Sequence, residues 1–470
     1  MSIFITPFYI NSPVNIQECM VSLRGLGFKL LREGRLFRKI LFDLEKSQYC
    51  SDEELRQLQR EKLGSMINYA YQNSPYYKRL FGKLHLTPAD FKDISDLKKL
   101  PFISKKDVKG NSEDFLAVNV NRHFIRKVFT SGTTGSPLKV YRDLYSINFE
   151  NALLRRQYRW AGFCPDDRKV ILRSSPIVPS DIKRPPFWRK DLFQKSLFIS
   201  AYHLSKENIE YYFNEIKKYK PVALETVPSA GYLMARLLRF RGLKLDFKYV
   251  FTSSEVLMPH QKEFMQKEFG TQVLDHYGTA ERVSSIGMCE KGNYHIYPED
   301  AVTELVPLEG RKDTFEIVGT TLNNFAMPLL RYKTGDIVRL SSQRCSCSRN
   351  FQTIESIDGR KTEECFVTKD GRFVSLLSGM LSMDLKNVIE TQFIQEDIGK
   401  IKIKIVTGNG YSDFDELKLR KSIKNFLGDD VNIQVEKVTS IPRTDGGKFK
   451  QFISNLNANI RESNANYREF

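Results

Sequence analysis

The feature that most constrains this chain is a regular alternation of short apolar runs and amphipathic stretches between about residues 125 and 340. The apolar runs include KVILRSS, PVALETV, FKYVFTSSE, QVLDHYG and FEIVGTT, and the stretches between them include ENIEYYFNEIKKY and PHQKEFMQKEF. Short strands that alternate with helices build a sheet that is buried under helices. The sequence therefore predicts a large α/β domain.

The pattern changes after about residue 360. IKIKIVT and VNIQVEKV alternate apolar and polar residues, as half-buried strands do, and DELKLRKSIKNFL between them has the spacing of a helix. These segments predict a small α+β domain with one face of its sheet in solvent. We expect a basic N-terminal segment at 1–50, a large domain at 51–359 and a small C-terminal domain at 360–470, with the boundary near IDGRKTEE.

The N-terminal segment combines apolar residues at roughly helical spacing with many cations over 23–46. This pattern predicts a basic amphipathic helix, weakened by three glycines. Such a helix could lie on an anionic membrane, or it could be an ordinary surface helix packed on the protein body. The residues behind the prediction are Leu26, Leu30, Phe37, Leu41, Leu44, Arg24, Lys29, Arg32, Arg35, Arg38, Lys39, Gly25, Gly27 and Gly34. A further helical segment is expected over 51–84, where Ser51 and Glu54 form a capping-box pattern.

The net charge of the chain indicates which classes of partner it can bind. It carries 73 Lys and Arg against 56 Asp and Glu, a net charge of +17. Nucleic acid, anionic lipid and phosphorylated substrates are all candidate partners for such a basic protein. No run approaches the roughly 18 apolar residues of a membrane-spanning helix, and the start lacks the regions of a secretory signal. We therefore expect a cytoplasmic protein, with peripheral contact at the inner membrane face as an open alternative.

The first motif with chemical content is TSGTTGSPLK at 130–139. Its glycines allow a tight loop with inward N–H groups, and its hydroxyls and lysine add donors, so it could cradle a polyphosphate. It is not a Walker A loop, because no Gly-Lys-Ser/Thr follows. The alternative is a Ser/Thr-rich surface turn.

Four further motifs follow along the chain. In DHYGTAE, Glu281 could hold Mg²⁺ and Tyr277 could stack on a purine, or the segment could simply begin a helix with a favourable acid. In RYKTGD, Asp336 could accept from ribose hydroxyls, or the segment could be a hairpin turn. DGRK lies at the change of pattern, and IPRTDGGK places Lys448 on a glycine-rich loop that could reach across a cleft or be a solvated turn.

In this order and at these separations, the five motifs resemble those of the adenylate-forming superfamily, from about residue 50 to 453. Within it, QREKLGSMINYAYQNSPYYKRLF and DLKKLPFISKKDV are similar to the opening of the phenylacetate–CoA ligase-like branch. ERVSSIGMCEKGNYHIYPED, IVGTTLNNFAMPLLRYKTGD and IPRTDGGKFKQFIS resemble the capsular-polysaccharide CapK subgroup. The resemblance implies a large α/β adenylation domain and a small mobile α+β lid.

The resemblance also implies a two-step reaction. A carboxylate attacks the α-phosphorus of ATP to give an acyl-adenylate and pyrophosphate, and an acceptor then displaces AMP. Positioning and charge neutralisation carry such a step. The small domain would turn about a hinge at Lys361 between the two steps.

The residue roles implied by the resemblance divide between the two domains. Lys448, Glu281 and Thr279 would be catalytic: Lys448 would bridge the carboxylate and the α-phosphate, while Thr279 and Glu281 would serve the α-phosphate and Mg²⁺. Tyr277 would stack on adenine beside Ser254 and Glu255. The remaining nucleotide contacts would come from Ser131, Gly132, Thr133, Thr134, Gly135 and Lys139 on the phosphates, from Gly278, from Asp336 on the ribose, and from Arg360.

Three of the seven cysteines and one histidine form a candidate metal site. Cys289-x₅-His295 and Cys345-x-Cys347 offer three thiolates and one imidazole, which can close a tetrahedral, structural Zn²⁺ site. The uneven spacing of all seven cysteines also favours a metal over disulfides. Unlinked thiols are the alternative. Relatives tend to have Cys-Gly-Arg where this chain has Cys347-Ser348-Arg349, and a serine would weaken the site if that turn needs a positive φ.

The substrate and acceptor stay open. RSSPIVPSDIKRPPFWRK at 173–190 is basic and would suit an anionic carboxylate if it lines the pocket, or it could be a surface loop. The small-molecule or glycan carboxylate could be a uronic acid joined to an amine in capsule or O-antigen synthesis, or the acceptor could be CoA. A basic membrane-surface or nucleic-acid scaffold with a vestigial nucleotide site is a third alternative, although no recognised nucleic-acid motif is present and nucleic acid is not expected.

Overall fold

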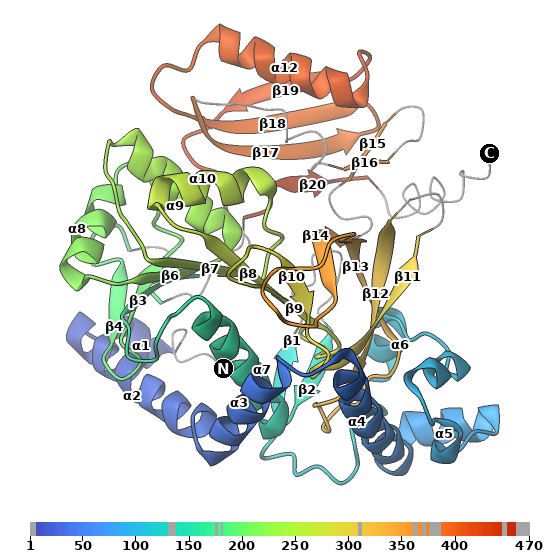
Figure 1. Cartoon of the computed structure of the whole chain (residues 1–470). Helices are drawn as coiled ribbons and strands as arrows, with labels where there is room; N and C mark the ends of the chain where they lie inside the picture. The colour runs from blue at the N-terminus through green and yellow to red at the C-terminus, as the bar shows by residue number, and fades with distance from the viewer. Residues whose placement is uncertain are drawn as a thin grey trace.

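A computed structural model describes most of the chain, and two sheets dominate it (Figure 1). A 12-stranded mixed sheet has the order β11-β12-β13-β14-β10-β9-β8-β7-β6-β3-β5-β4, and a four-stranded sheet has the order β19-β18-β17-β20. The described residues are 6–129, 138–173, 177–179, 182–308, 313–360, 365–368, 373–375, 387–443 and 449–456.

One half of the large sheet is parallel. Its strands β5, β3, β6, β7 and β8 are joined by parallel ladders, and β4 closes the edge antiparallel to β5. The bounds are β3 (Lys169–Arg173), β4 (Trp188–Asp191), β5 (Ser196–Ser200), β6 (Ala223–Thr226), β7 (Tyr249–Ser253) and β8 (Val273–Gly278). Parallel strands need buried faces, which explains their nearly continuous apolar runs.

The other half of the large sheet is antiparallel. Its strands are β9 (Ser285–Met288), β10 (Tyr294–Ile296), β11 (Ala301–Pro307), β12 (Thr314–Thr321), β13 (Tyr332–Leu340) and β14 (Thr353–Arg360). A separate hairpin, β1 (Arg126–Phe129) with β2 (Lys139–Arg142), stands beside it. The predicted α/β fold with a large buried sheet is confirmed.

Helices pack closely on the parallel half of the sheet. They are α7 (Leu144–Trp160), α8 (Ile209–Tyr219), α9 (Pro228–Phe240) and α10 (Pro259–Phe269). Gly231 lets α9 approach β6, because a Cβ there would lie only 2.7 Å from Cγ2 of Thr226. The resulting core includes Leu224, Met234 and Val250.

The N-terminal part contains two helices where one was predicted over 23–46. They are α2 (Val14–Arg32) and α3 (Arg35–Ser47), and the extended backbone of Gly34 separates them. The apolar face of α3 packs on α7, with Phe37, Ile40 and Leu41 buried, whereas Leu30 of α2 is 69% exposed. Therefore the single continuous helix was wrong, and for α3 the surface-helix alternative holds.

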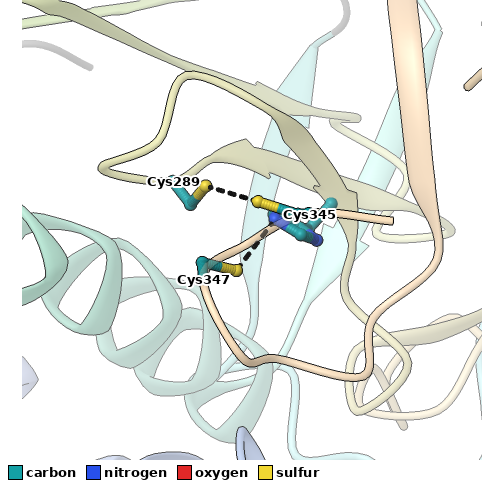
Figure 2. A group of neighbouring side chains, drawn as sticks. Cys289, Cys345 and Cys347 are labelled. Carbon is teal, nitrogen blue, oxygen red and sulfur yellow. Dashed lines mark hydrogen bonds between the residues drawn. The ribbon is translucent and has the colours of Figure 1, made fainter. Parts of the chain in front are cut away.

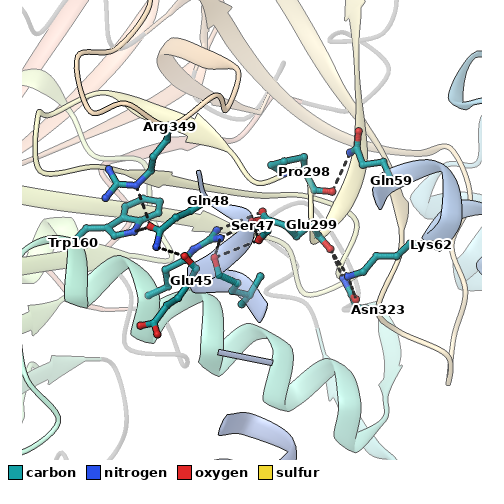
Figure 3. Close-up of polar contacts among 12 residues, drawn as sticks. Glu45, Ser47, Gln48, Gln59, Lys62, Trp160, Pro298, Glu299, Asn323 and Arg349 are labelled. Atoms are coloured by element: carbon teal, nitrogen blue, oxygen red, sulfur yellow. Dashed lines mark hydrogen bonds and ion pairs between the residues drawn. The ribbon is translucent and has the colours of Figure 1, made fainter. Parts of the chain in front are cut away.

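The segments around these helices complete the N-terminal part. They are α1 (Pro7–Asn11), α4 (Asp52–Asn73), α5 (Pro75–Leu84), α6 (Lys105–Gly110) and two 3₁₀ turns, Pro88–Asp90 and Ile94–Lys99. The Ser51–Glu54 capping box predicted at the start of α4 is present. Figure 3 shows how α3 and α4 are tied to the loop before β11: Ser47 donates to the buried Glu299 carboxylate at 2.7 Å, and Lys62 donates to the Glu299 carbonyl at 3.0 Å.

The second sheet belongs to the C-terminal part of the chain. It consists of β17 (Val388–Asp397), β18 (Lys400–Thr407), β19 (Asn432–Lys437) and β20 (Phe452–Ser454), with α12 (Asp413–Leu427) packed on it and the short pair β15 (Cys365–Val367) and β16 (Phe373–Ser375) alongside. Ile389, Val406 and Ile441 join the core cluster formed by α9, so the small sheet rests on that helix (Figure 1). Among the described helices, none is both long enough and apolar enough to span a bilayer.

Candidate active site and metal centre

The residues predicted to hold the nucleoside meet where β8 ends. Tyr277, at the end of β8, donates its hydroxyl to Oδ2 of Asp336 on β13 at 2.6 Å. Asp336 follows Gly335, whose φ of +77° turns the strand, and its amide donates to Oγ1 of Thr334 at 3.0 Å. Burial and the Asp336 carboxylate raise the pKa of Tyr277 well above its usual range, so this phenol remains a donor. The RYKTGD segment is thus part of a strand rather than an isolated hairpin turn.

The predicted hinge motif, DGRK, also lies beside Asp336. Asp336 faces Arg360 in the ladder between β13 and β14. Gly359, with a φ of +75°, lies so close to Val256 that a Cβ would come within 2.9 Å of Cγ2 of that valine. The end of β14 therefore adjoins both Asp336 and the turn after β7. Lys361 lies outside the described residues.

That turn holds the two residues predicted beside adenine. Ser254 directly follows β7 and adopts a positive φ of +72°. Oε2 of Glu255 accepts from the backbone amide of Ser229 at 3.0 Å, at the N-terminus of α9, where a carboxylate is favoured. The predicted adenine side thus forms one rim around the carboxyl ends of β7 and β8.

Glu281 and Thr279 lie in a tight turn between β8 and β9, not at the start of a helix. Oγ1 of Thr279 accepts from the amide of Val283 at 3.2 Å, and Gly278 precedes the turn as the last residue of β8. Oε1 of Glu281 accepts from the hydroxyl of Tyr332 at 3.0 Å. Tyr332 begins β13 and belongs to the RYKTGD motif, but no role was predicted for it.

The predicted phosphate loop is described only at its ends. Ser131, Gly132, Thr133, Thr134 and Gly135 lie outside the described residues. The flanking Phe129 and Lys139 pair with each other at the end of the β1–β2 hairpin from which this loop leaves. Lys139 donates to Oε1 of Glu113 at 2.7 Å, so binding a phosphate would require it to leave this partner.

A second cation from the same hairpin was not predicted. Arg142 on β2 donates from Nη2 to the carbonyl of Ala280 at 2.6 Å, next to Glu281. Burial lowers its pKa to about 9, and repulsion from Arg282 adds to the effect. Only its position three residues after Lys139 could have suggested it. Arg142 therefore fixes the predicted phosphate hairpin beside the Thr279–Glu281 turn.

Lys448, the predicted catalytic lysine, lies outside the described residues. The chain on either side of it is placed: Arg443 pairs with Glu390 on β17, and Phe449 packs against the core cluster formed by α9. The side chain of Arg360 is likewise not described.

The basic residues of the segment 173–190, which was expected to line the substrate pocket, lie in different environments. Arg189 donates to Oε1 of Gln17 at 2.6 Å and Lys190 pairs with Glu215 at 2.9 Å, so both serve packing rather than a pocket. Lys183 and Arg184 are exposed. Only Arg173 reaches the strand ends.

Arg173 lies at the end of β3. Its guanidinium donates to Oγ of Ser253 at 3.0 Å and pairs with Glu225 at 2.9 Å. Burial alone would raise the pKa of Glu225, but Lys169 and Arg173 outweigh it and hold the pKa at about 2. Nε of Arg173 is buried and has no hydrogen-bond partner among the described residues.

The four predicted zinc ligands converge, and Figure 2 shows the three cysteines among them. Sγ of Cys289 lies 3.6 Å from Sγ of Cys345, and Sγ of Cys347 lies 3.4 Å from Nε2 of His295. All four ligand atoms lie within 4.8 Å of one another. Zinc bonds of about 2.3 Å to sulfur and 2.0 Å to nitrogen separate tetrahedral ligands by about 3.5 to 3.8 Å. The donor set and its spacing therefore fit a tetrahedral zinc ion.

Hydrogen bonds orient two of these groups, while burial raises the pKa of the Cys289 thiol to about 12. Nδ1 of His295 donates to the carbonyl of Phe351 at 3.4 Å, which leaves Nε2 free to ligate. The amide of Lys291 donates to Sγ of Cys289 at 3.4 Å. Burial lowers the pKa of His295 to about 4, so this imidazole is neutral at pH 7.

The serine that departs from the Cys-Gly-Arg pattern does take a positive φ. Ser348 has a φ of +63°, the region in which a side chain is strained by about 1 kcal/mol or more. The turn is nevertheless anchored, because Arg349 pairs with Glu290 at 2.9 Å and lies 4.0 Å from the ring centre of Trp160. The expected strain is present, yet Cys345 and Cys347 still reach the other two ligands.

The fold first defines a class of protein. It is similar to 2-hydroxyisobutyryl-CoA ligase in the postadenylation state in complex with R3-HIB-AMP, with a TM-score of 0.67, 16% identity, and coverage of 90% of this chain and 94% of that chain. The same enzyme in the thioesterification state with 2-HIB-AMP and CoA gives a TM-score of 0.52 at 17% identity, over 91% and 94% of the two chains. The chain has the fold of adenylate-forming ligases.

Comparison of the sequence gives a narrower group of relatives than comparison of the fold. "Protein CapK" of Staphylococcus aureus is 27% identical over 456 residues, which is 95% of this chain and 99% of that protein. "Phenylacetate-coenzyme A ligase" of Aromatoleum evansii is 26% identical over 442 residues, 87% of this chain and 97% of that protein. Residues 366–455 match the CapK C-terminal domain. The predicted resemblance to CapK and the phenylacetate–CoA ligases, and the prediction of an adenylate-forming ligase, are confirmed, and the scaffold alternative is not favoured.

Proposed function

We propose that this protein uses ATP to adenylate a carboxylate and then transfers the acyl group to an acceptor. The observation that carries the proposal is the meeting of Tyr277, Asp336 and the main chain of Arg360 at the end of β8. Three motifs that lie far apart in the sequence thus form one nucleoside site. Glu281, held by Tyr332, would bind Mg²⁺, whose charge would offset that of the phosphates.

The first step needs positioning more than covalent help. One carboxylate oxygen attacks the α-phosphorus of ATP, the bond to the β-phosphate oxygen breaks, and pyrophosphate leaves with the electron pair. Thr279 would hold the α-phosphate, and Lys448 would neutralise the charge that builds between the carboxylate and the α-phosphorus. The loop with Ser131, Thr133 and Thr134 would hold the outer phosphates.

The proposed carboxylate is polar, as in a uronic acid of a capsule or O-antigen repeat. Arg173 supports this choice, because its buried Nε–H has no partner among the described residues and could serve an anionic or hydroxylated substrate. A purely apolar arylacetate would leave that donor unpaired, which costs about 1 to 3 kcal/mol.

Two classes of acceptor are compatible with this reaction. An amine would give an amide, as the likeness to CapK suggests for polysaccharide synthesis. CoA would give a thioester, and similarity to phenylacetate–CoA ligases over most of the chain favours it. Both acceptors displace AMP from the same acyl-adenylate, so the first step is common to them.

The deciding experiment is exchange of labelled pyrophosphate into ATP, with Mg²⁺, across a panel of uronic acids, amino acids and arylacetates. Exchange with one class would establish adenylation and identify the carboxylate, after which amines and CoA are tested as acceptors. Lys448→Ala should abolish exchange while ATP still binds. Lys421→Ala, an exposed lysine on α12, is the matched control and should leave exchange unchanged. Absence of ATP binding by the wild-type protein would overturn the proposal.

We propose that zinc is bound by Cys289, His295, Cys345 and Cys347 and is structural. Four protein ligands leave no open position for a substrate. The ion would join the β9–β10 hairpin to the segment before β14, the strand that leads to the hinge. Metal analysis of the purified protein should find about one zinc per chain.

We also propose that the protein works at the inner membrane face. A glycan carried on a lipid would present its carboxylate there, and the net charge of +17 suits an anionic surface.

A further inference from the structure

Helix α2 has an apolar face that nothing in the described part of the chain covers. Ile16, Leu23 and Leu30 follow one another at intervals of seven residues, which is two helical turns, so they lie in one line along the helix. Leu31 lies beside Leu30, and Phe8 and Ile10 extend from the neighbouring α1. These six side chains, the N-terminal apolar face, are between 41% and 69% exposed.

The opposite side of α2 is firmly packed, which fixes the direction in which the apolar face points. Gln17, Val21 and Gly25 are buried. A Cβ on Gly25 would lie 2.0 Å from Oδ2 of Asp191, so the helix backbone rests directly on β4. Gln17 accepts from buried Arg189 at 2.6 Å. The apolar face therefore cannot turn inward without breaking these contacts.

The charges next to this face are nearly all positive. The exposed charged side chains between residues 29 and 46 are five cations, Lys29, Arg35, Arg38, Lys39 and Lys46, and one carboxylate, Asp43. Two acids in the same stretch are already paired, Glu33 with Arg155 and Glu45 with Arg159. The surface thus combines a line of large apolar groups with uncompensated positive charge.

We propose that the N-terminal apolar face docks on an anionic lipid surface. Apolar side chains would enter the boundary between headgroups and acyl chains, and the cations of α2 and α3 would meet the anionic headgroups. A symmetric contact with a second copy would instead bring the same cations against one another. The complementary partner is therefore an anionic bilayer.

The location suits such docking. α1, α2 and α3 lie at the far side of the large sheet from the C-terminal sheet (Figure 1). A bilayer against α2 would leave the small domain in the aqueous phase. Docking would bring a lipid-linked substrate to the enzyme only if the proposed function holds, whereas vesicle binding is measured without any substrate.

The test is co-sedimentation of the full-length protein with vesicles of phosphatidylcholine alone or with about one third phosphatidylglycerol. We expect at least about tenfold stronger binding to the anionic vesicles, and at least about a tenfold loss with Leu23→Glu/Leu30→Glu. The control pair Phe414→Glu/Leu417→Glu alters side chains of similar exposure, 74% and 65%, on α12 and should bind as wild type. Arg38→Glu/Lys39→Glu should remove the preference for anionic vesicles.

Three outcomes would overturn the proposal. They are no vesicle binding by the wild-type protein, equal binding by the Leu23→Glu/Leu30→Glu variant, and a wild-type dimer that this variant converts to a monomer. The last outcome would identify the face as an interface between copies. Unchanged melting temperature and unchanged pyrophosphate exchange with a soluble carboxylate would show that the variants are folded and that the active site is intact.

Discussion

The buried ion pair between Arg156 and Glu299 offers the sharpest test of how the N-terminal part is held to the large sheet. Arg156, on α7, is fully buried and donates to Oε1 of Glu299 at 2.6 Å. The same Nη1 donates to the carbonyl of Leu44 on α3 at 3.0 Å, and Ser47 of α3 donates to Glu299 (Figure 3). One arginine thus connects α7, α3 and the loop before β11.

The perturbation is Arg156→Leu. Among the described residues, only the Ser47 hydroxyl would then remain bonded to the buried Glu299 carboxylate. An uncompensated buried charge costs about 3 to 5 kcal/mol of unfolding free energy. The substitution also removes the guanidinium from the ring of Tyr297, 4.9 Å from the ring centre, which adds to the loss. We expect a total of about 4 kcal/mol or more.

The second variant removes both charges. Arg156→Leu/Glu299→Leu leaves no buried ion, so most of the desolvation cost disappears and the double variant should be more stable than Arg156→Leu. Urea unfolding of the wild type, both single variants and the double variant gives the coupling energy, which we expect to exceed about 2 kcal/mol. If the double variant is as unstable as the sum of the single ones, the pair does not act as a unit and the reasoning is refuted.

Three further predictions concern the site, the metal centre and acid stability. Asp336→Asn should weaken ATP binding about tenfold or more in a calorimetric titration, because ribose hydroxyls lose a charged acceptor; unchanged affinity would place the ribose elsewhere. Cys289→Ser should lower bound zinc to well below one per chain and lower the melting temperature, and a chelator should destabilise the wild type but not this variant. Burial lowers the pKa of His260 to about 4, so the folded state resists a proton that the unfolded state accepts below pH 6.5, and stability falls as the pH drops. His260→Phe, which keeps the ring contact with Tyr232, should reduce that fall between pH 7 and 5 by about 2 kcal/mol, as measured by urea unfolding at each pH; an unchanged slope would contradict the assignment.

The sequence predicted a strand or helix well where the pattern of apolar residues within that element was enough to identify it. The run QVLDHYG became β8, and IKIKIVT became β18 with its isoleucines inward. The prediction failed where the partner is distant in sequence. Nothing in 23–46 shows that α7 covers Phe37 while Leu30 stays exposed. Arg189, in the segment that could have lined a pocket or formed a surface loop, is instead bound by Gln17, 172 residues earlier in the chain.

In the candidate site, too, local motifs were predicted and contacts between distant residues were not. The resemblance of the motifs, in their order, to the adenylate-forming superfamily implied that Tyr277, Glu281 and Asp336 act together, and the structure brings Tyr277 and Asp336 into contact. The supporting contacts could not be predicted. Arg142 carries no sequence signature of its own, and the RYKTGD motif that contains Tyr332 does not indicate its hydrogen bond to Glu281. Ser348 is the exception: the departure from glycine predicted a strained turn, and the positive φ is there.

The course of β14 brings the predicted hinge next to the predicted ribose-binding motif. Arg360 ends this strand opposite Asp336, and Gly359 passes within contact of Val256 on the adenine rim. The chain therefore leaves the large sheet between the two sides of the proposed nucleoside site. If the small domain turns about Lys361, the pivot lies one residue beyond this point. A rotation there would leave the main chain of Arg360 beside the nucleotide while Lys448, far along the small domain, moves away. On this proposal, a hinge at Lys361 couples the lid to the nucleotide without carrying the contact at Arg360 away with it.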